Sequence, residues 1–316
     1  MKRNLFLSLI AMFLFTAANA QKDETKYERN VLVEEFTTEM CPNCPPVASM
    51  VKDVLAKPEY SEKVIMVAHH AGYYTDDFTT EADEAMMWFY NTSGTYAPAM
   101  MFDRYPNFQD GRTKTPVGFV YEMYEMEKYI KRRLNKKSHV SIDITAEFDN
   151  DKTLTVRVKG DRIKNFSNTD PVIFVYLTEN NVPAKKQAGA GKDYIHAHVT
   201  RAHNYKWGDI LKWDGDNYEY ECQLTVDPSW NKEEMDIVVA ISAFDVEDCN
   251  ECVVENTRSV AFSSTNGIED TMVDSNIVKT EYFTLDGVQT TSPSNGLFIK
   301  KTTFASGKVE TKKVIF

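Results

Sequence analysis

The sequence has 316 residues, of which 42% are hydrophobic, with a formal net charge of −11 at pH 7. This length and apolar content predict two or three domains with real hydrophobic cores. The negative charge argues against nucleic acid as a partner, because a strongly anionic protein repels phosphate backbones.

Residues 1–20 predict a secretory signal peptide. Lys2 and Arg3 precede an apolar stretch, and Ala18-Asn19-Ala20 is a small-residue cleavage site. No cysteine follows the cut, so a lipid anchor at this point is not expected. No later segment is apolar enough to cross a bilayer, so the mature chain is expected to lack a transmembrane helix. We therefore expect an exported protein of the periplasm, outer membrane or cell surface, where peripheral membrane association is allowed and disulfides persist.

Residues 21–137 predict alternating strands and helices. Near-continuous apolar runs at 31–37 and 63–69 predict strands that are buried on both faces. Apolar residues at helical spacing predict helices that begin near 45, near 80 and near 116. A short strand is expected at 99–102. This alternation indicates a parallel or mixed sheet with helices on both faces.

From residue 138 the pattern changes to alternation with a period of two. Strands are expected at 140–146, 153–158, 172–177, 218–226, 237–244 and 253–262. Short alternating strands with turn signals between them predict an antiparallel β-sandwich over 138–262. Residues 263–280 read as a polar linker, and 281–316 as a small β module. The expected fold class is a multidomain chain of α/β plus all-β type.

Cys41-Pro42-Asn43-Cys44 lies between the first predicted strand and the first predicted helix. A sulfur at the start of a helix is close to free amides and to the positive end of the macrodipole, which favour a thiolate. Because the thiolate is the form that attacks disulfides, this placement predicts a redox-type pair. The alternatives are a structural disulfide and one half of a zinc site.

Glu35 and Pro98 complete the candidate site. Glu35 is on the first strand, and Pro98 precedes the strand at 99–102. Together with Cys41 and Cys44 they resemble the thioredoxin superfamily, which implies a thioredoxin-like domain over 21–137. The resemblance also implies a cis peptide at Pro98 beside the sulfurs, and a buried Glu35 carboxylate that accepts the proton of the second cysteine. For Glu35 the alternative is an exposed edge or a salt bridge.

The same segment departs from thioredoxins next to the cysteines. Met40 stands where tryptophan is usual, Pro42 replaces a glycine, and Glu35 is one methylene longer than the usual aspartate. Residues between the two cysteines tune the redox potential, so the sequence leaves its value open.

Other stretches resemble the twenty-eight-kilodalton outer-membrane protein family of Bacteroidetes. They are Val33–Thr37 with the cysteine motif, Asp103-Arg104 after Pro98, and His196–Arg201 followed by Trp207-Gly208. The resemblance covers most of residues 30–262. Because the biochemical activity of that family is poorly defined, the resemblance implies a location more than a function.

The C-terminal tail resembles the sorting domain of the type IX secretion system. The resemblance lies in Tyr282–Gly287, Asn295–Lys300, Gly307-Lys308 and Lys312–Val314, with Val288 where arginine is usual. It implies that the tail directs passage through the outer membrane. The alternative is a small β module used for docking.

Cys249 and Cys252 have the same spacing as the first pair, but no helix follows them. We expect a local structural disulfide that closes a loop, with joint zinc binding by both pairs as the alternative. Cys222 is either a buried thiol or a partner of one of these two. His196 and His198 share a face of a predicted strand, where polar packing is expected rather than a metal site.

The sequence therefore predicts an exported thiol-disulfide oxidoreductase that acts on protein thiols or disulfides of the envelope or surface, without a cofactor. Cys41 is the attacking thiolate and Cys44 the resolving thiol. Glu35 assists proton transfer, and Pro98 shapes the substrate groove. The alternative is a non-catalytic, adhesin-like binding module for an unknown surface ligand, in which the Cys41–Cys44 bridge is structural.

Overall fold

The computed structural model describes residues 27–91, 96–150, 152–163, 166, 170–191, 193–262, 277–284, 287–290, 296–304 and 309–315. The predicted signal peptide, residues 1–20, lies outside the described residues, as do residues 263–276 of the predicted linker. The chain divides into two compact units, Met1–Asn266 and Gly267–Phe316.

The first part of the larger unit alternates strands and helices as predicted. Its elements are β1 (Val31–Thr37), α1 (Cys44–Leu55), β2 (Val64–His70), α2 (Glu81–Tyr90), β3 (Ala99–Phe102), β4 (Phe108–Asp110), β5 (Thr113–Thr115) and α3 (Met123–Leu134). The third helix begins later than expected, at Met123, because the chain near Gly118 instead pairs with β3: the backbone groups of Gly118 and Met100 exchange two hydrogen bonds, of 2.9 and 3.1 Å.

The second part is built from strands. They are β6 (Asp143–Asn150), β7 (Thr153–Asp161), β8 (Val172–Glu179), β9 (Val182–Pro183), β10 (Ile195–His196), β11 (Val199–His203), β12 (Asp209–Ile210), β13 (Asn217–Thr225), β14 (Met235–Ser242) and β15 (Val254–Ala261). Short 3-10 helices cover Lys232–Glu234 and Cys249–Glu251.

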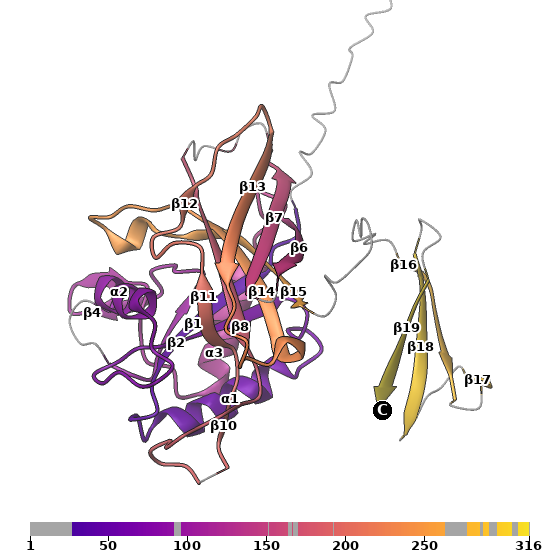
Figure 1. Ribbon diagram of the computed structural model, residues 1–316, viewed down its shortest axis with the longest axis horizontal. Coiled ribbons are helices and arrows are strands. Elements are labelled where there is room, and N and C mark those ends of the chain that lie inside the picture. Colours follow the sequence, from indigo (N-terminus) through magenta and orange to yellow (C-terminus); the bar gives the residue numbers. More distant parts are fainter. Residues whose placement is uncertain are drawn as a thin grey trace, which may run out of the picture. The chain divides into compact units, whose positions relative to one another are not determined.

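The expected fold class is wrong, because the first part does not form a thioredoxin-like α/β domain of its own. One mixed sheet runs in the order β15-β14-β8-β11-β2-β1-β3, with β12 paired to β8, and so joins strands from both parts (Figure 1). β11 is the junction, since it is parallel to β2 and antiparallel to β8. Strands dominate the described residues, which contain three α-helices of 10 to 12 residues.

One face of this sheet carries a single continuous core. Leu32 and Phe36 of β1, Phe174 and Tyr176 of β8 and Val238 of β14 belong to the same buried cluster, together with residues of α2. The amide of Val254 also donates to the carbonyl of Asp103, at 2.8 Å, so the start of β15 meets the end of β3. The first and second parts therefore share their interior and depend on each other for it.

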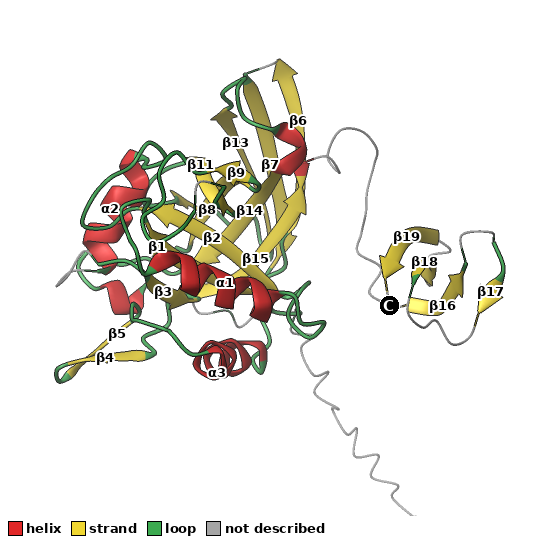
Figure 2. Cartoon of the chain, turned by 90° about the horizontal axis from the view of Figure 1, so that it is seen from below, coloured by secondary structure: helices red, strands yellow, loops and turns green. Residues whose placement is uncertain are grey.

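The opposite face is covered by different elements at its two ends. Val31 and Val33 of β1 pack against Val47 and Val51 of α1 and against α3. At the other end the three-stranded sheet β13-β7-β6 packs its apolar side chains on β8 and β14. In Figure 2, α1 and α3 lie at the end formed by β1 and β3, whereas β6, β7 and β13 rise at the other end.

The smaller unit is an antiparallel sheet in the order β17-β16-β18-β19. Its strands are β16 (Ile277–Phe283), β17 (Gln289–Thr290), β18 (Leu297–Phe304) and β19 (Val309–Ile315). The sequence predicted a small β module over 281–316, but β16 begins earlier, at Ile277, within the segment 263–280 that was expected to be a linker. The domain boundaries expected from the sequence stay predictions.

Among the residues that the structure describes, no helix has the length and apolar character needed to cross a bilayer.

Candidate functional site

The predicted cysteine pair forms a disulfide at the start of α1. Cys41 and Cys44 are bridged, with their Cα atoms 5.5 Å apart, and Cys44 is the first residue of the helix. Pro45 and Pro46 follow, and because proline has no N–H, two of the amides that are usually free at a helix start are missing. The first turn carries no acidic residue. With these two amides missing, a thiolate here depends mainly on the helix dipole for its stabilisation, and no acidic side chain in the first turn opposes the dipole.

Both sulfur-bearing residues are covered. Cys41 is 7% exposed and Cys44 is 2% exposed. The cover includes the loop between β9 and β10, which we call the cap loop (residues 184–191). The side-chain amide of Gln187 donates to the carbonyl of Cys41 at 2.9 Å, across 146 residues of sequence. The sequence did not predict this contact, because nothing in the composition of the cap loop indicates that it packs against cysteines so distant in the sequence.

Glu39 connects the cap loop to the cysteine segment. Its carboxylate Oε1 accepts hydrogen bonds from the backbone amides of Lys185, at 2.6 Å, and Lys186, at 3.1 Å. Its carbonyl accepts a third, from the amide of Ala188, at 2.7 Å. Its own amide donates to Asp76 Oδ2 at 2.7 Å. Sequence reasoning also missed Glu39, although an acidic residue two positions before Cys41 is a signal that could have been weighed.

Glu35 is buried on the side of the sheet that α1 covers. It is 5% exposed and alternates with Val31 and Val33, which pack against α1. Burial raises the pKa of its carboxyl to about 8, and its Oε1 has no hydrogen-bond partner. Glu35 is therefore a carboxylic acid that keeps its proton at neutral pH, rather than an exposed edge residue. Its role as a proton carrier stays a prediction.

The peptide between Ala97 and Pro98 is cis. Its neighbourhood is tight: a Cβ added to Gly72 would lie 3.3 Å from both Ala97 Cβ and Thr38 Cγ2. Ala97 and the segment that leads into Cys41 therefore approach each other across Gly72. The expected role of Pro98 in shaping a substrate groove stays a prediction.

The second cysteine pair differs from expectation, since Cys249 and Cys252 are thiols in the structure and the predicted disulfide is not formed. Cys252 is fully buried, and its Sγ accepts the amide of Asp245 at 3.3 Å. Cys249 is only half-buried. Burial raises the pKa of both thiols. Cys222 is also a thiol, and burial raises its pKa to about 11.

His196 and His198 do not share a strand face. β10 ends at His196, and His198 has a positive φ of 57° in the turn before β11. The ring of His196 instead lies 4.8 Å from that of His70, and burial lowers its pKa to about 4. Within the described ranges, no group of three or more His, Cys, Asp and Glu side chains is arranged to hold a metal ion.

A buried ionic network lies on the other face of β1. Arg104 donates to both oxygens of Glu34, at 2.8 and 2.7 Å, and to the Tyr176 hydroxyl at 2.8 Å. His69 bridges Glu34 and Asp83. The pKa of Glu34 is lowered to about 2: burial opposes ionisation, but the adjacent Arg104 and His69 outweigh it. The network joins both parts of the sheet through side chains that have no access to solvent.

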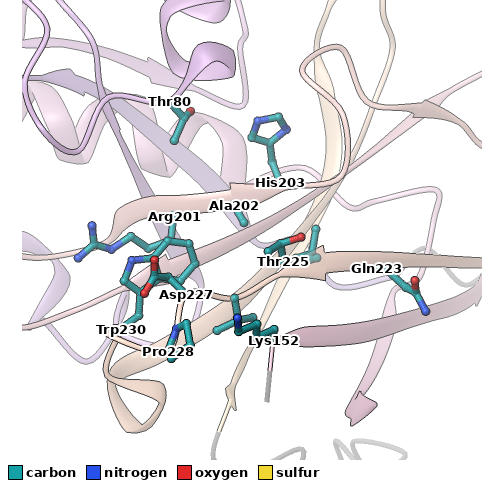
Figure 3. A pocket seen from close by; sticks show the side chains of 12 residues that line it. Thr80, Lys152, Arg201, Ala202, His203, Gln223, Thr225, Asp227, Pro228 and Trp230 are labelled. Atoms are coloured by element: carbon teal, nitrogen blue, oxygen red, sulfur yellow. The ribbon is translucent and has the colours of Figure 1, made fainter. Parts of the chain in front are cut away.

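A pocket of about 560 Å³ lies away from the cysteines, beside β11 and β13 (Figure 3). Arg201 lines it, and its Nε donates to Glu179 at 2.7 Å. The guanidinium carbon of Arg201 lies 5.2 Å from the ring centre of Phe78 and 5.5 Å from that of Trp230. These contacts hold a cationic side chain in place at the wall of the pocket.

One family model matches the chain over more than half of its length. Residues 104–266, slightly more than half of the chain, match the outer membrane protein Omp28 family. The fold is similar to that of HBP35 of Porphyromonas gingivalis, with a TM-score of 0.63 and 16% identity over 92% of this chain and 99% of that chain. This likeness spans both of the segments that the sequence assigned to separate fold classes.

A domain of the outer membrane lipoprotein Omp28 from Porphyromonas gingivalis is 21% identical, over 39% of this chain and 87% of that chain, with a TM-score of 0.25. No curated protein matches the sequence.

Proposed function

The chain belongs to the outer membrane protein Omp28 family, and from this premise we propose that its Cys41–Cys44 pair exchanges disulfides with other exported proteins. The predicted export to the outer membrane or cell surface is confirmed by the family. Disulfides form and persist outside the cytoplasm, so protein thiols and disulfides are the substrate class. Electrons pass directly between sulfur atoms in this reaction, which therefore uses no cofactor.

The observation that carries the proposal is the position of the disulfide at the start of α1. A helix dipole stabilises a negative charge at this end, so one sulfur becomes a better leaving group and, once reduced, a more abundant thiolate. Cys41 is the less buried of the two residues, at 7% against 2% exposed. We therefore assign Cys41 as the sulfur that bonds to the client and Cys44 as the resolving thiol.

The exchange balances without another reactant. In the oxidising direction, a client thiolate attacks the Cys41 sulfur, and Cys44 leaves as a thiolate. A second client thiolate then attacks the client sulfur of this mixed disulfide and releases Cys41. The client gains a disulfide, and the protein is left as a dithiol. The reverse direction reduces a client disulfide by the same steps.

Glu35 is proposed as the proton carrier for Cys44. Its pKa of about 8 lies near that of a thiol, so a proton can pass between the two groups without a large energy difference. Its position on the α1 side of β1 supports this role. Pro98 is proposed to border the client groove, because Ala97, which precedes it, and Thr38, which lies three residues before Cys41, both flank Gly72.

The redox potential of the pair tests the proposal. The intact protein is equilibrated with glutathione buffers, and the Cys41–Cys44 state is measured by alkylation and mass spectrometry. We expect a potential between about −120 and −270 mV, where working couples lie. A value below about −300 mV identifies a structural bridge. Cys41→Ser is expected to abolish reduction of insulin, and activity that survives in this variant would contradict the assignment.

The C-terminal sheet is proposed to be a sorting module of the type IX secretion system. Its support is that β16, β17, β18 and β19 form one sheet within a compact unit, in line with the sequence resemblance. Removal of residues 281–316 is expected to stop passage through the outer membrane and to leave the protein in the periplasm. Surface display of the shortened chain would contradict this proposal.

A second candidate function is a binding module, and the pocket beside Arg201 is the observation that favours it. Arg201 contacts two aromatic rings and uses its Nε to bind Glu179. Its two remaining guanidinium nitrogens are the donors that would bind a carboxylate or phosphate group. We expect succinate or inorganic phosphate to raise the melting temperature of the wild type but not of Arg201→Gln. No shift in the wild type with either compound would count against the module.

A further inference from the structure

The cap loop occupies the backbone groups that flank the disulfide. Lys185, Lys186 and Ala188 bond to Glu39 through their amides, and the side chain of Gln187 bonds to the carbonyl of Cys41. Four hydrogen bonds therefore converge on the residues just before the disulfide loop. Two of them end on a carboxylate, and hydrogen bonds to charged groups are stronger than neutral ones.

The loop also lies in direct backbone contact with Pro42, between the two cysteines. Gly189 has a positive φ of 75°, and a Cβ added to it would be 2.3 Å from the Pro42 carbonyl oxygen and 2.9 Å from Pro42 Cα. No side chain fits in that space. The contact is therefore possible only because residue 189 is glycine, and it leaves no room for a client chain over Pro42.

Little else holds the cap loop down. Gln187 is the only residue of 184–191 that is buried. The strands on either side, β9 and β10, pair over two residues each. An exposed ion pair between Lys185 and Asp77 adds a contact at the surface, where such pairs contribute little. A segment with few buried apolar contacts opens locally at a much lower free energy than the whole fold.

We propose that the cap loop is an autoinhibitory segment that Glu39 latches over the Cys41–Cys44 disulfide. The closed loop blocks approach to the sulfurs, and exchange takes place from a locally opened state. Opening frees the carbonyls of Glu39 and Cys41 and the Glu39 carboxylate. These groups are all acceptors, so an extended polypeptide with free backbone amides replaces the loop. The inference deepens the proposed function by naming an extended client segment as its substrate.

Two glycines of the loop provide a matched pair of variants. Gly189→Ala forces the loop away from Pro42. Gly191→Ala is the control, because an added Cβ there has no atom within 4 Å. Each intact, oxidised protein is mixed with excess dithiothreitol, and the Cys41–Cys44 bridge is followed by quenched alkylation and peptide mass spectrometry. We expect Gly189→Ala to react about tenfold faster than the wild type, and Gly191→Ala to react at the wild-type rate.

Glu39→Ala tests the latch without adding bulk to the loop. It removes the acceptor of two charge-assisted hydrogen bonds, so we expect an acceleration of about tenfold or more. Glu62→Ala removes an exposed carboxylate elsewhere on the same unit and serves as its control. Wild-type rates for both Glu39→Ala and Gly189→Ala would overturn the proposal.

Urea separates local opening from global unfolding. For local opening, the wild-type rate of bridge reduction rises only slightly with urea below the unfolding transition. A urea slope as steep as that of global unfolding would overturn the proposal, because the bridge would then react only in the unfolded chain. The ratio of each variant's rate to the wild-type rate reports on the cap, whereas the potential reports on the cysteine couple. A potential below about −300 mV together with accelerated Gly189→Ala and Glu39→Ala would remove the proposed function alone. A potential in the working range together with wild-type rates for both variants would remove the cap alone.

Discussion

Glu34 and Arg104, 70 residues apart in the sequence, form a two-pronged ion pair in which neither side chain is exposed to solvent. The pair lies on the continuous core face of the sheet. Arg104 also donates to Tyr176 of β8, so the contact ties β1 to the second part of the chain.

Loss of one member of this pair is expected to be strongly destabilising. Arg104→Met leaves the Glu34 carboxylate buried without its partner, which lowers the free energy of unfolding by about 3–5 kcal/mol. Urea titration measures the change. Arg157→Met is the control, because Arg157 pairs with Glu147 and Glu221 at the surface, where such pairs contribute about 0–1 kcal/mol. Equal losses for the two variants would contradict this account of the network.

Glu35 is expected to make the fold less stable as the pH rises. Its pKa is raised to about 8 by burial, so the unfolded chain releases this proton from about pH 4.5 upward while the folded chain still holds it. Stability associated with Glu35 is full below pH 4.5 and falls until pH 8. Glu35→Gln removes the effect, so it is expected to stabilise the protein by about 3 kcal/mol at pH 7 and hardly at all at pH 4. Unfolding titrations at both pH values check the difference.

The stability that His69 contributes also falls as the pH rises, but in a higher pH range. For Glu35 the folded state disfavours the charged form, whereas for His69 it favours the charged form. The pKa of its ring is raised to about 9: burial opposes the charge, but Asp83 and Glu34 outweigh it. The stability that the imidazolium contributes is fully present below pH 6.5 and is lost as the pH rises to 9. NMR titration of the ring is expected to give a midpoint near 9. A midpoint near 6.5 would mean that the two carboxylates do not hold the charge.

Only the first cysteine pair is expected to be bridged in the native protein. Peptide mapping after native alkylation is expected to recover the Cys41–Cys44 bridge and unmodified Cys252, which is fully buried. Cys249 is half-buried and is expected to be labelled first. Cys222 is also half-buried, and its raised pKa slows its reaction. A recovered Cys249–Cys252 bridge would instead support the local disulfide expected from the sequence.

The sequence was sufficient for local elements. β1, α1, α2 and β3 lie where apolar spacing placed them, and the Cys41–Cys44 motif is at the start of α1. The pairing of strands that are distant in the sequence could not be predicted. β11 has five residues and two strand partners, and no local pattern shows that it joins β2 to β8.

The candidate site likewise contains residues that the sequence could locate and residues that only the long-range contacts of the fold show. Cys41 and Cys44 could be located by their spacing, and Pro98 by the resemblance to thioredoxins. For Glu35, a glutamate in an apolar strand, the sequence left both burial and an exposed edge or salt bridge open. The cap loop could not be located, because Gln187 and Gly189 act through contacts with Cys41 and Pro42 that lie far away in sequence. Cys249 and Cys252 have the spacing of a bridge but are both thiols, which the spacing alone could not show.

The position of β11 between β2 and β8 has a consequence for biogenesis. The signal peptide predicted at residues 1–20 brings the N-terminal end out of the cytoplasm first, yet β2 cannot gain its second neighbour until β11 has followed. The interior shared with β14 closes later still. Because folding that depends on such distant pairings is slow, we expect the exported chain to complete this sheet only after β11 has followed β2 out of the cytoplasm.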